Sequence, residues 1–256
     1  MKLEKITRWL DKTLNVAAFD DVSNNGLQID RSSVSDIGQT QITQSPNHPI
    51  STVAFAVDAS VRAVEAAAKA GAQLLVVHHG ISWGGGIRRV SGGVGNVIRA
   101  AIENKLALYA CHLPLDAHPT LGNNAQLAKL LGLKRVKPAF SYHGNVIGLV
   151  GVLERLEALA SLDRLVKLEG LAAPLTVGVC SGGAGEFAEE AKDLGCDLYL
   201  TGEASWGDVI AAENVGMKML CLGHYETEVW GVRAVAKAMK RALKLRTVDL
   251  TELLRA

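Results

Sequence analysis

The chain has 256 residues, of which 48% are hydrophobic and 21% are charged, so it can bury a sizeable core as one large domain or two modest lobes. This composition excludes a wholly disordered chain. Lys and Arg number 27 against 26 Asp and Glu, which gives a formal net charge of +1. A charge so close to zero argues against nucleic acid or an anionic membrane as the main partner.

The N-terminus and the cysteines indicate a cytoplasmic protein without a membrane segment. Residues 1–12 mix charged and apolar side chains and lack the apolar stretch of a signal peptide. No window approaches the roughly eighteen apolar residues that a membrane span needs. The cysteines are isolated and form no CxxC pair, which favours buried reduced thiols; they are Cys111, Cys180, Cys196 and Cys221.

The first half of the chain alternates predicted strands and helices. We expect a helix over residues 6–14, a loop at 46–49, a strand over 52–57, a helix over 60–70, and strands over 74–77 and 106–111. The helix at 60–70 is rich in alanine, the best helix former. The strand at 74–77 carries no charge, as expected for a strand that is covered on both faces. This order predicts an α/β fold with a parallel sheet and right-handed crossovers.

The second half repeats this organisation after a short break. Residues 134–142 have the Pro and Lys content of a linker, and strands are expected over 146–153 and 217–222, followed by a basic helix over 233–243 and a last strand over 246–250. We therefore expect two similar α/β lobes, residues 1–132 and 133–256. In an alternative arrangement, the closing segment 223–256 packs on the first lobe.

Identical residues at a constant spacing suggest an internal duplication. Positions 124 apart carry the same residue in the pairs Thr52/Thr176, Val53/Val177, Glu65/Glu189, Ala67/Ala191, Gly71/Gly195 and Leu74/Leu198. Further on, Glu103, Asn104 and Cys111 match Glu213, Asn214 and Cys221, 110 positions later. Residues 175–222 thus look like a diverged copy of the first lobe, related to it by an approximate two-fold axis near a shared site. The alternative is chance similarity between two alanine-rich units.

Five of the seven histidines fall in three short clusters, each of which follows an apolar run predicted as a strand. The clusters are His78-His79, His112-Leu113-Pro114-Leu115-Asp116-Ala117-His118, and His224-Tyr225-Glu226-Thr227-Glu228. Ligands at the ends of neighbouring strands lie in the crevice where α/β proteins form binding sites. Imidazole and carboxylate groups bind zinc, iron, manganese or nickel. The sequence therefore predicts a metal site.

His78 and His79 are adjacent, so a regular strand would point them to opposite faces. If the strand ends there and turns at Gly80, both rings can reach one cavity and serve different ions. The alternative is one core histidine beside one surface histidine. Asp116 offers two oxygens that can bridge two cations. For the flanking His112 and His118 we expect an outward-pointing loop position, and the alternative is that one of them contacts a metal ligand from behind.

His224 and Glu228 are four residues apart, so they lie on one face if residues 225–230 open a helix. Glu226 is a weaker candidate, because a solvated charge near a helix N-terminus is the simpler interpretation. The glycine-rich loop 83–96 carries Arg88 and Arg89, which would clamp an anion if the loop is a mobile lid. A plain surface loop is the alternative.

The remaining motifs are weaker. Residues 181–185 read Ser-Gly-Gly-Ala-Gly before a helix, where backbone N–H groups can cradle an anion, but they match neither the Walker pattern nor a dinucleotide fingerprint. There is no GxSxG elbow, and no cysteine is paired with a base as a nucleophile. No catalytic residue is therefore assigned from the sequence.

Several segments, in this order, resemble the Nif-three-like dinuclear-metal family, whose members are usually named GTP cyclohydrolase I type 2 homologues. The segments are Asn25-Gly26-Leu27-Gln28, Val77-His78-His79-Gly80, His112 to His118, Leu121 to Ala128, Thr201-Gly202-Glu203 and Gly223 to Glu228. The run from His112 to Ala128 is close to the short bacterial form. The resemblance implies two similar α/β lobes with the metals between them, and a toroidal hexamer.

The resemblance also implies two divalent metal ions per chain, bound by the same residues that spacing selects: His78, His79, Asp116, His224 and Glu228. We expect a metal-dependent hydrolase of a small anionic or nucleotide-like substrate, with His112 and Glu203 as candidates for second-sphere contacts or proton transfer. The alternative is a non-catalytic metal-binding scaffold or an adaptor protein.

Overall fold

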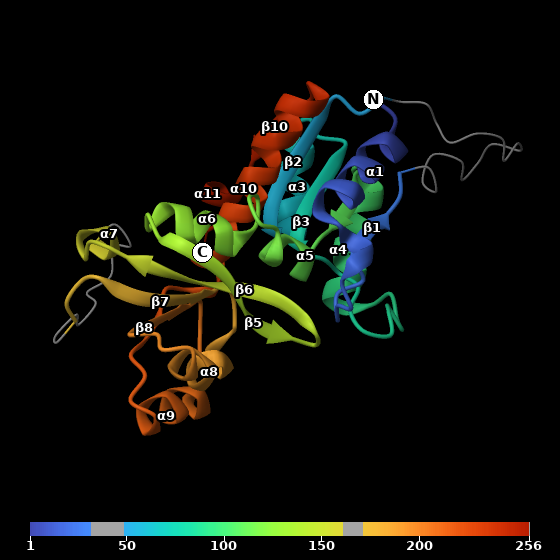
Figure 1. The fold of residues 1–256 in the computed structure, drawn as a ribbon. Helices are drawn as coiled ribbons and strands as arrows, with labels where there is room; N and C mark the ends of the chain where they lie inside the picture. Colours follow the sequence, from blue (N-terminus) through green and yellow to red (C-terminus); the bar gives the residue numbers. More distant parts are fainter. Residues whose placement is uncertain (32–48, 161–170, 256) are drawn as a thin grey trace, which may run out of the picture. The chain divides into compact units, whose positions relative to one another are not determined.

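The computed structural model describes residues 1–31, 49–160 and 171–255, so the loop expected at 46–49 lies almost entirely outside the described residues. The chain forms two compact units (Figure 1), of which unit 1 contains residues 1–115 and 232–256 and unit 2 contains residues 116–231. Both units combine a sheet with helices. The mixed α/β class predicted from the sequence is therefore confirmed.

Unit 1 is built on a five-stranded sheet within the described residues, in the order β1-β4-β3-β2-β10. Strands β2, β3, β4 and β10 are parallel, and β1 is antiparallel to β4. Its elements are α1 (Leu3–Leu14), η1 (Val16–Ala18), β1 (Gly26–Ile29), β2 (Thr52–Asp58), α3 (Val61–Lys69), β3 (Leu74–His79), α4 (Gly92–Glu103), β4 (Ala107–Ala110), α5 (Leu113–Ala117), whose last two residues belong to unit 2, most of α10 (His224–Leu243), β10 (Arg246–Asp249) and α11 (Thr251–Leu254).

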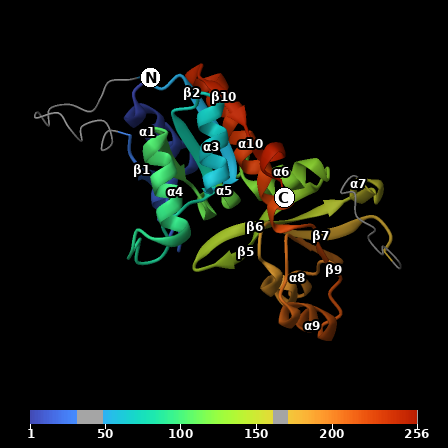
Figure 2. The ribbon, with the colours of Figure 1, turned by 180° about the vertical axis from the view of Figure 1, so that it is seen from behind.

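Helices cover both faces of this sheet because its strands are apolar on both sides. Ala54 and Ala56 of β2 pack with α3 and α4, which lie in front of the sheet in Figure 2. Tyr109 of β4 is buried against the opposite face, where its hydroxyl donates to Asp11 of α1 at 2.7 Å. Ser60 caps α3 by accepting from the Ala63 N–H at 3.1 Å.

Unit 2 contains a second five-stranded sheet in its described part, in the order β5-β6-β7-β8-β9. Strands β7, β8 and β9 are parallel, whereas β5 and β6 run antiparallel to their neighbours. Its elements are α6 (Asn123–Leu130), β5 (Lys134–Tyr142), β6 (Asn145–Leu153), α7 (Glu157–Ala160), β7 (Leu175–Cys180), η2 (Gly185–Phe187), α8 (Ala188–Asp193), β8 (Leu198–Thr201), α9 (Trp206–Asn214), β9 (Met219–Cys221) and the first residues of α10.

The linker expected at residues 134–142 is wrong, because these residues form the strand β5. Pro138 is compatible with this strand because β5 lies at the edge of the sheet, where one side needs no hydrogen-bond donors. Most of the strand is exposed, so it lacks the apolar pattern that identifies a buried strand. The boundary expected after residue 132 stays a prediction; in the structure, α6 packs on β6 and β7 of unit 2.

The two units share an internal pattern. In both, three parallel strands follow one another in the same order, β2-β3-β4 and β7-β8-β9. Val53 pairs with Leu74, and Val177 pairs with Leu198, so the registers match at the 124-residue spacing. The side chain of Gln73 accepts from the Thr52 N–H, and Asp197 accepts from the equivalent Thr176 N–H. A common origin stays a prediction that this pattern favours.

One part of the sequence alignment needs correction. The turn after α4 closes with the Leu106 N–H donating to the Ala101 carbonyl, and the turn after α9 closes with Met217 donating to Ala212. Met217 and Ala212 are thus the counterparts of Leu106 and Ala101, at an offset of 111 positions. The sequence comparison expected an offset of 110 positions. Glu103 therefore corresponds in structure to Asn214, and the Glu-Asn match is a coincidence of two helix C-termini.

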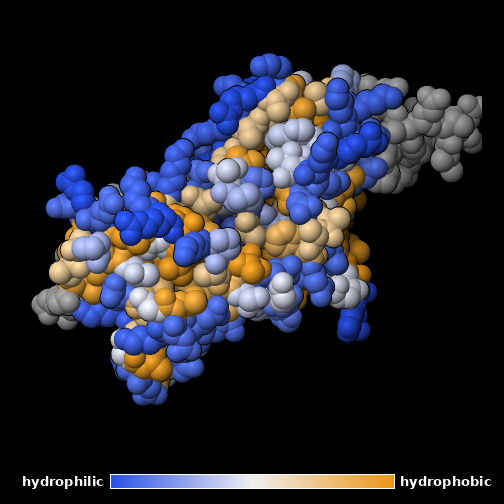
Figure 3. All heavy atoms as spheres, in the orientation of Figure 1, coloured by the Kyte–Doolittle hydropathy of each residue, from blue (hydrophilic) through white to orange (hydrophobic). Residues whose placement is uncertain are grey.

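The surface carries both hydrophilic and apolar side chains. Figure 3 shows hydrophilic and apolar residues mixed over one face. Val90 and Trp206 are the most exposed of the large apolar side chains in the described part of the chain, at 68% and 77%. No helix in the described part of the chain is long and apolar enough to cross a membrane.

Phe140 packs over two glycines of neighbouring strands in unit 2. A Cβ at Gly148 would lie 2.5 Å from Phe140 Cδ2, and a Cβ at Gly178 would lie 2.8 Å from Phe140 Cζ and 3.0 Å from Tyr199 Cδ2. Real carbon atoms do not approach so closely, so these positions require glycine. This packing also fixes β7, the strand that leads to Ser181 and Gly182.

We predict that Gly178→Ala lowers the free energy of unfolding by about 1–3 kcal/mol, because the added methyl group overpacks the core against Phe140 and Tyr199. Urea denaturation measures this change. Gly85→Ala serves as the control, since a Cβ there meets nothing within 4 Å. Equal stabilities of the two variants would contradict the packing described for Phe140.

Candidate metal centre

Three imidazoles gather at the carboxyl ends of β3 and β4 in unit 1. Strand β3 continues through His78 and His79, two residues beyond the predicted end, and His112 follows β4. The ring centroids are 4.5 Å apart for His78 and His79, 5.1 Å for His78 and His112, and 5.6 Å for His79 and His112. One ring nitrogen from each lies within 4.8 Å of the others, so the three residues form a group that can hold a metal ion.

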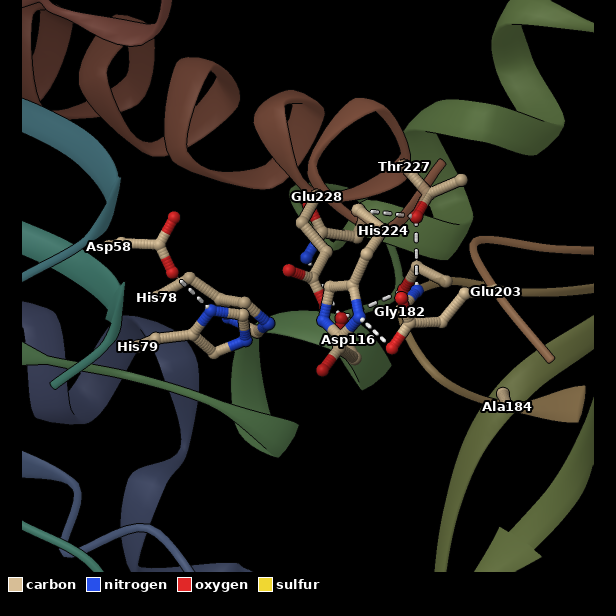
Figure 4. Close-up of polar contacts among 12 residues, drawn as sticks. Asp58, His78, His79, Asp116, Gly182, Ala184, Glu203, His224, Thr227 and Glu228 are labelled. Atoms are coloured by element: carbon tan, nitrogen blue, oxygen red, sulfur yellow. Dashed lines mark hydrogen bonds and ion pairs between the residues drawn. The ribbon is translucent and has the colours of Figure 1, made fainter. Parts of the chain in front are cut away.

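An acceptor oxygen fixes the orientation of each of these rings. His78 Nδ1 bonds the Cys111 carbonyl at 2.9 Å, His79 Nδ1 bonds Asp58 Oδ1 at 2.8 Å, and His112 Nδ1 bonds Asp21 Oδ1 at 2.9 Å. Figure 4 shows the contact of His79 with Asp58. Carbonyl and carboxylate oxygens only accept, so each Nδ1 carries the hydrogen and Nε2 offers its lone pair to a cation when the ring is neutral. Hydrogen-bonded histidines of this kind are typical of metal sites.

Asp21 organises the segment before His112 and was missed by the sequence reasoning. Its Oδ2 accepts from the Leu113 N–H at 2.9 Å and from Asn25 Nδ2 at 2.8 Å, and Asn25 Oδ1 accepts from the His112 N–H at 2.8 Å. Burial alone would raise the pKa of Asp21, but the hydrogen bond and charge of His112, with help from the Ser23 N–H and Asn25, lower it. Asn25 belongs to a segment that carried the family resemblance, whereas Asp21 stood in no recognised motif.

Asp58 was also missed, although strand register could have identified it. Asp58 ends β2 and is the register partner of His79 on the parallel strand β3. A carboxylate at this position lies beside the imidazole because neighbouring parallel strands are less than 5 Å apart. Aligning the two predicted strands would therefore have paired Asp58 with His79.

Trp83 lies beside the imidazoles, at 5.1 Å from His112 and 6.0 Å from His79 between ring centroids. Its indole N–H donates to the Gly80 carbonyl at 3.0 Å.

The loop expected at 83–96 is shorter in the structure, because α4 begins at Gly92 and residues 92–96 are therefore helical. Arg88 and Arg89 are exposed in the remaining loop, and the lid proposed for them stays a prediction.

Asp116 is a buried carboxylate of unit 2. Its Oδ1 accepts from Asn123 Nδ2 at 2.8 Å and from the Ser181 hydroxyl at 2.9 Å. Asn123 opens α6, and Ser181 directly follows β7. The flanking His118 uses Nδ1 to accept from the Thr120 and Leu121 N–H groups at 3.2 and 2.9 Å, which is compatible with the loop position expected for it.

His224 and Glu228 lie at the start of α10, as the four-residue spacing predicted. His224 Nε2 is 3.1 Å from Glu228 Oε1, and its Nδ1 is 3.0 Å from Glu203 Oε1 (Figure 4). The hydrogen bond with Glu228 is the largest influence that raises the pKa of His224 to about 9; burial opposes it, and Glu203 adds to it. Glu203 thus orients His224, and its expected place behind the metal ligands stays a prediction.

Two N–H groups of the Ser181–Gly185 segment bond threonine hydroxyls, and an anion cradle formed by the segment stays a prediction. Gly182 has a φ of +71°, and a Cβ there would lie 2.5 Å from Glu228 Oε1, so only glycine fits. Its N–H donates to Thr227 Oγ1 at 3.0 Å, and the Ala184 N–H donates to Thr201 Oγ1 at 3.3 Å. These two N–H groups are therefore already used by threonine hydroxyls.

We predict that metal-free protein loses stability as the pH rises from about 6.5 to about 9. The pKa of His224 is raised from its ordinary value of 6.5 to about 9, so its charge stabilises the fold fully below the lower value and not above the higher one. Urea denaturation in chelator across this range measures the effect. Glu203→Gln should end the decline at a lower pH, whereas the exposed His143→Gln should leave it unchanged. A flat profile for wild-type protein would contradict the assignment.

Comparisons of the chain with known proteins point to one family. A profile of the family Duf34/NIF3 (NGG1p interacting factor 3) matches residues 1–253. A Pyrococcus horikoshii protein named GTP cyclohydrolase 1 type 2 homolog is 37% identical over 97% of each chain, and a Deinococcus radiodurans protein of the same name is 39% identical over 91% of this chain and 86% of its own. A solved structure titled protein ybgI, of unknown function, has a TM-score of 0.83 and 30% identity, with 98% of each chain covered. The resemblance seen in the motifs is confirmed, and the chain belongs to the Duf34/NIF3 family.

Proposed function

We propose that this protein binds two divalent metal ions through His78, His79, Asp116, His224 and Glu228. The observation that carries the proposal is the fixed orientation of the ligand imidazoles: Nδ1 of His78, His79 and His224 is held by the Cys111 carbonyl, Asp58 and Glu203, respectively. Three neutral imidazoles and two carboxylates form a mixed nitrogen and oxygen donor set that suits zinc, iron, manganese or nickel. His112 lies within reach of the same group and is a further candidate ligand.

The charge of this centre favours an anionic substrate. Counted over the proposed ligands alone, two divalent cations against the carboxylates of Asp116 and Glu228 leave an excess of positive charge for a phosphate or another anion, while Asp58 and Glu203 lie behind the histidines. Two ions about 3.5–4 Å apart can lower the pKa of a bridging water and stabilise developing negative charge. The name GTP cyclohydrolase 1 type 2 homolog, carried by several relatives, supports a nucleotide-like substrate. We therefore propose a metal-dependent hydrolase.

Other parts of the family resemblance stay proposals. These are a toroidal hexamer, a cytoplasmic location, and a duplicated fold with its metals between the lobes.

Trp83 supports a ligand with a planar ring, because its indole lies beside His79 and His112 and is 38% exposed.

We predict that purified wild-type protein holds two metal ions per chain, that Asp116→Ala holds neither, and that His118→Ala retains both. Asp116 is expected to serve both ions, whereas His118 uses its Nδ1 for the backbone of its own loop. Elemental analysis after dialysis measures the metal content. Retention of both ions by Asp116→Ala, with loss from His118→Ala, would contradict these roles. Acid should release the metal, because an imidazole must be neutral to coordinate.

We also predict turnover by metal-loaded wild-type protein on a panel of nucleotides and phosphoesters, with a loss of at least about 100-fold in Asp116→Ala, since the bridging water would no longer be activated. Product release followed by chromatography measures this. Metal-loaded protein that converts no member of the panel would support the alternative, a non-catalytic metal-binding scaffold.

A further inference from the structure

We infer that Ser181 and Asn123 are positioning residues that occupy Oδ1 of Asp116, so that Asp116 binds cations through Oδ2 alone. The inference deepens the proposed function and rests on it. All the contacts that carry it lie within unit 2. The sequence analysis expected Asp116 to bridge two cations through its two oxygens. With Oδ1 occupied, a bridge would instead use Oδ2 alone.

The first observation is that Oδ1 of Asp116 already has two donors. Asn123 Nδ2 lies at 2.8 Å and the Ser181 hydroxyl at 2.9 Å. An ionised carboxylate oxygen only accepts and has about two lone-pair sites, so both sites of Oδ1 are in use. The three side chains are 6%, 0% and 8% exposed for Asp116, Asn123 and Ser181. Water therefore does not compete freely for these bonds.

The second observation is that the amide of Asn123 has one possible orientation. Its Oδ1 accepts from the Gly231 N–H of α10 at 2.7 Å, and a backbone N–H can only donate. The Nδ2 group must then face Asp116, because the flipped amide would set an oxygen against the carboxylate. Asn123 thus ties Asp116 to the helix that carries His224 and Glu228.

The third observation is that Ser181 is held independently of its hydroxyl. Its backbone N–H donates to Asn124 Oδ1 at 2.7 Å, and Asn124 Nδ2 donates to the Ile147 carbonyl at 2.8 Å. Replacing the side chain by a methyl group therefore leaves the backbone anchored. Ser181→Ala removes one donor from Asp116, and Asn123→Asp replaces the other donor by an acceptor of the same shape.

The experiment measures the affinity and stoichiometry of Zn²⁺ by chelator competition on the full chain. Ser181→Ala should weaken binding about 10–100-fold, as is usual when a group that orients a ligand is lost. Asn123→Asp should weaken it at least as much, and Ser181→Thr, which keeps a hydroxyl, should restore most of the affinity. Ser60→Ala is the matched control, because it removes a helix cap from α3 in unit 1 and should lower the melting temperature without changing the affinity.

The outcomes separate the two proposals. A wild-type protein that binds no Zn²⁺ overturns the proposed function. A wild-type protein that binds two ions, with unchanged affinity in Ser181→Ala and Asn123→Asp, overturns only the positioning role. If Asn123→Asp does not fold, Ser181→Ala and Ser181→Thr decide. Coordination of an ion by Asp116 Oδ1 in a crystal structure of the Zn²⁺-loaded protein would also overturn it.

Discussion

His78, Asp116 and Glu228 of the candidate centre are buried, and burying a polar group costs free energy unless the group is hydrogen-bonded. Most of the surrounding structure follows from this requirement. Asp21 and Asp58 hold the imidazoles of His112 and His79, and the Cys111 carbonyl holds that of His78. In unit 2, Asn123 and Ser181 hold Asp116. These contacts fix the orientations of the side chains that they hold.

The parallel sheets supply the positions of these groups. Parallel strands end at the same edge, so residues that follow β2, β3 and β4 come together although they are far apart in sequence. Asp58, His79 and His112 show this in unit 1, and Ser181 and Glu203 occupy the corresponding ends of β7 and β8 in unit 2. This arrangement requires glycine at position 182, because any side chain there would collide with Glu228.

Two carboxylates flank the imidazole of His224 in unit 2. His224 lies between Glu203 and Glu228, and the Glu228 hydrogen bond raises its pKa to about 9. A cation must displace that proton before Nε2 can coordinate. Glu203 can keep its bond to Nδ1 in both states, so it can orient the ring before and after the exchange.

The sequence by itself determined the α/β class, most strands and helices, and the family, because apolar periodicity and contiguous motifs are local signals. It also selected the histidine clusters, since each follows a recognisable strand. It mistook β5 for a linker, because an exposed edge strand with a proline has no apolar pattern. Only the tertiary structure decided that Asp21 holds the imidazole of His112 and which donors saturate Asp116 Oδ1. Those contacts join residues from Asp21 to His112 and from Asp116 to Ser181, and such distant pairs are set by strand register and helix packing, which no local pattern encodes.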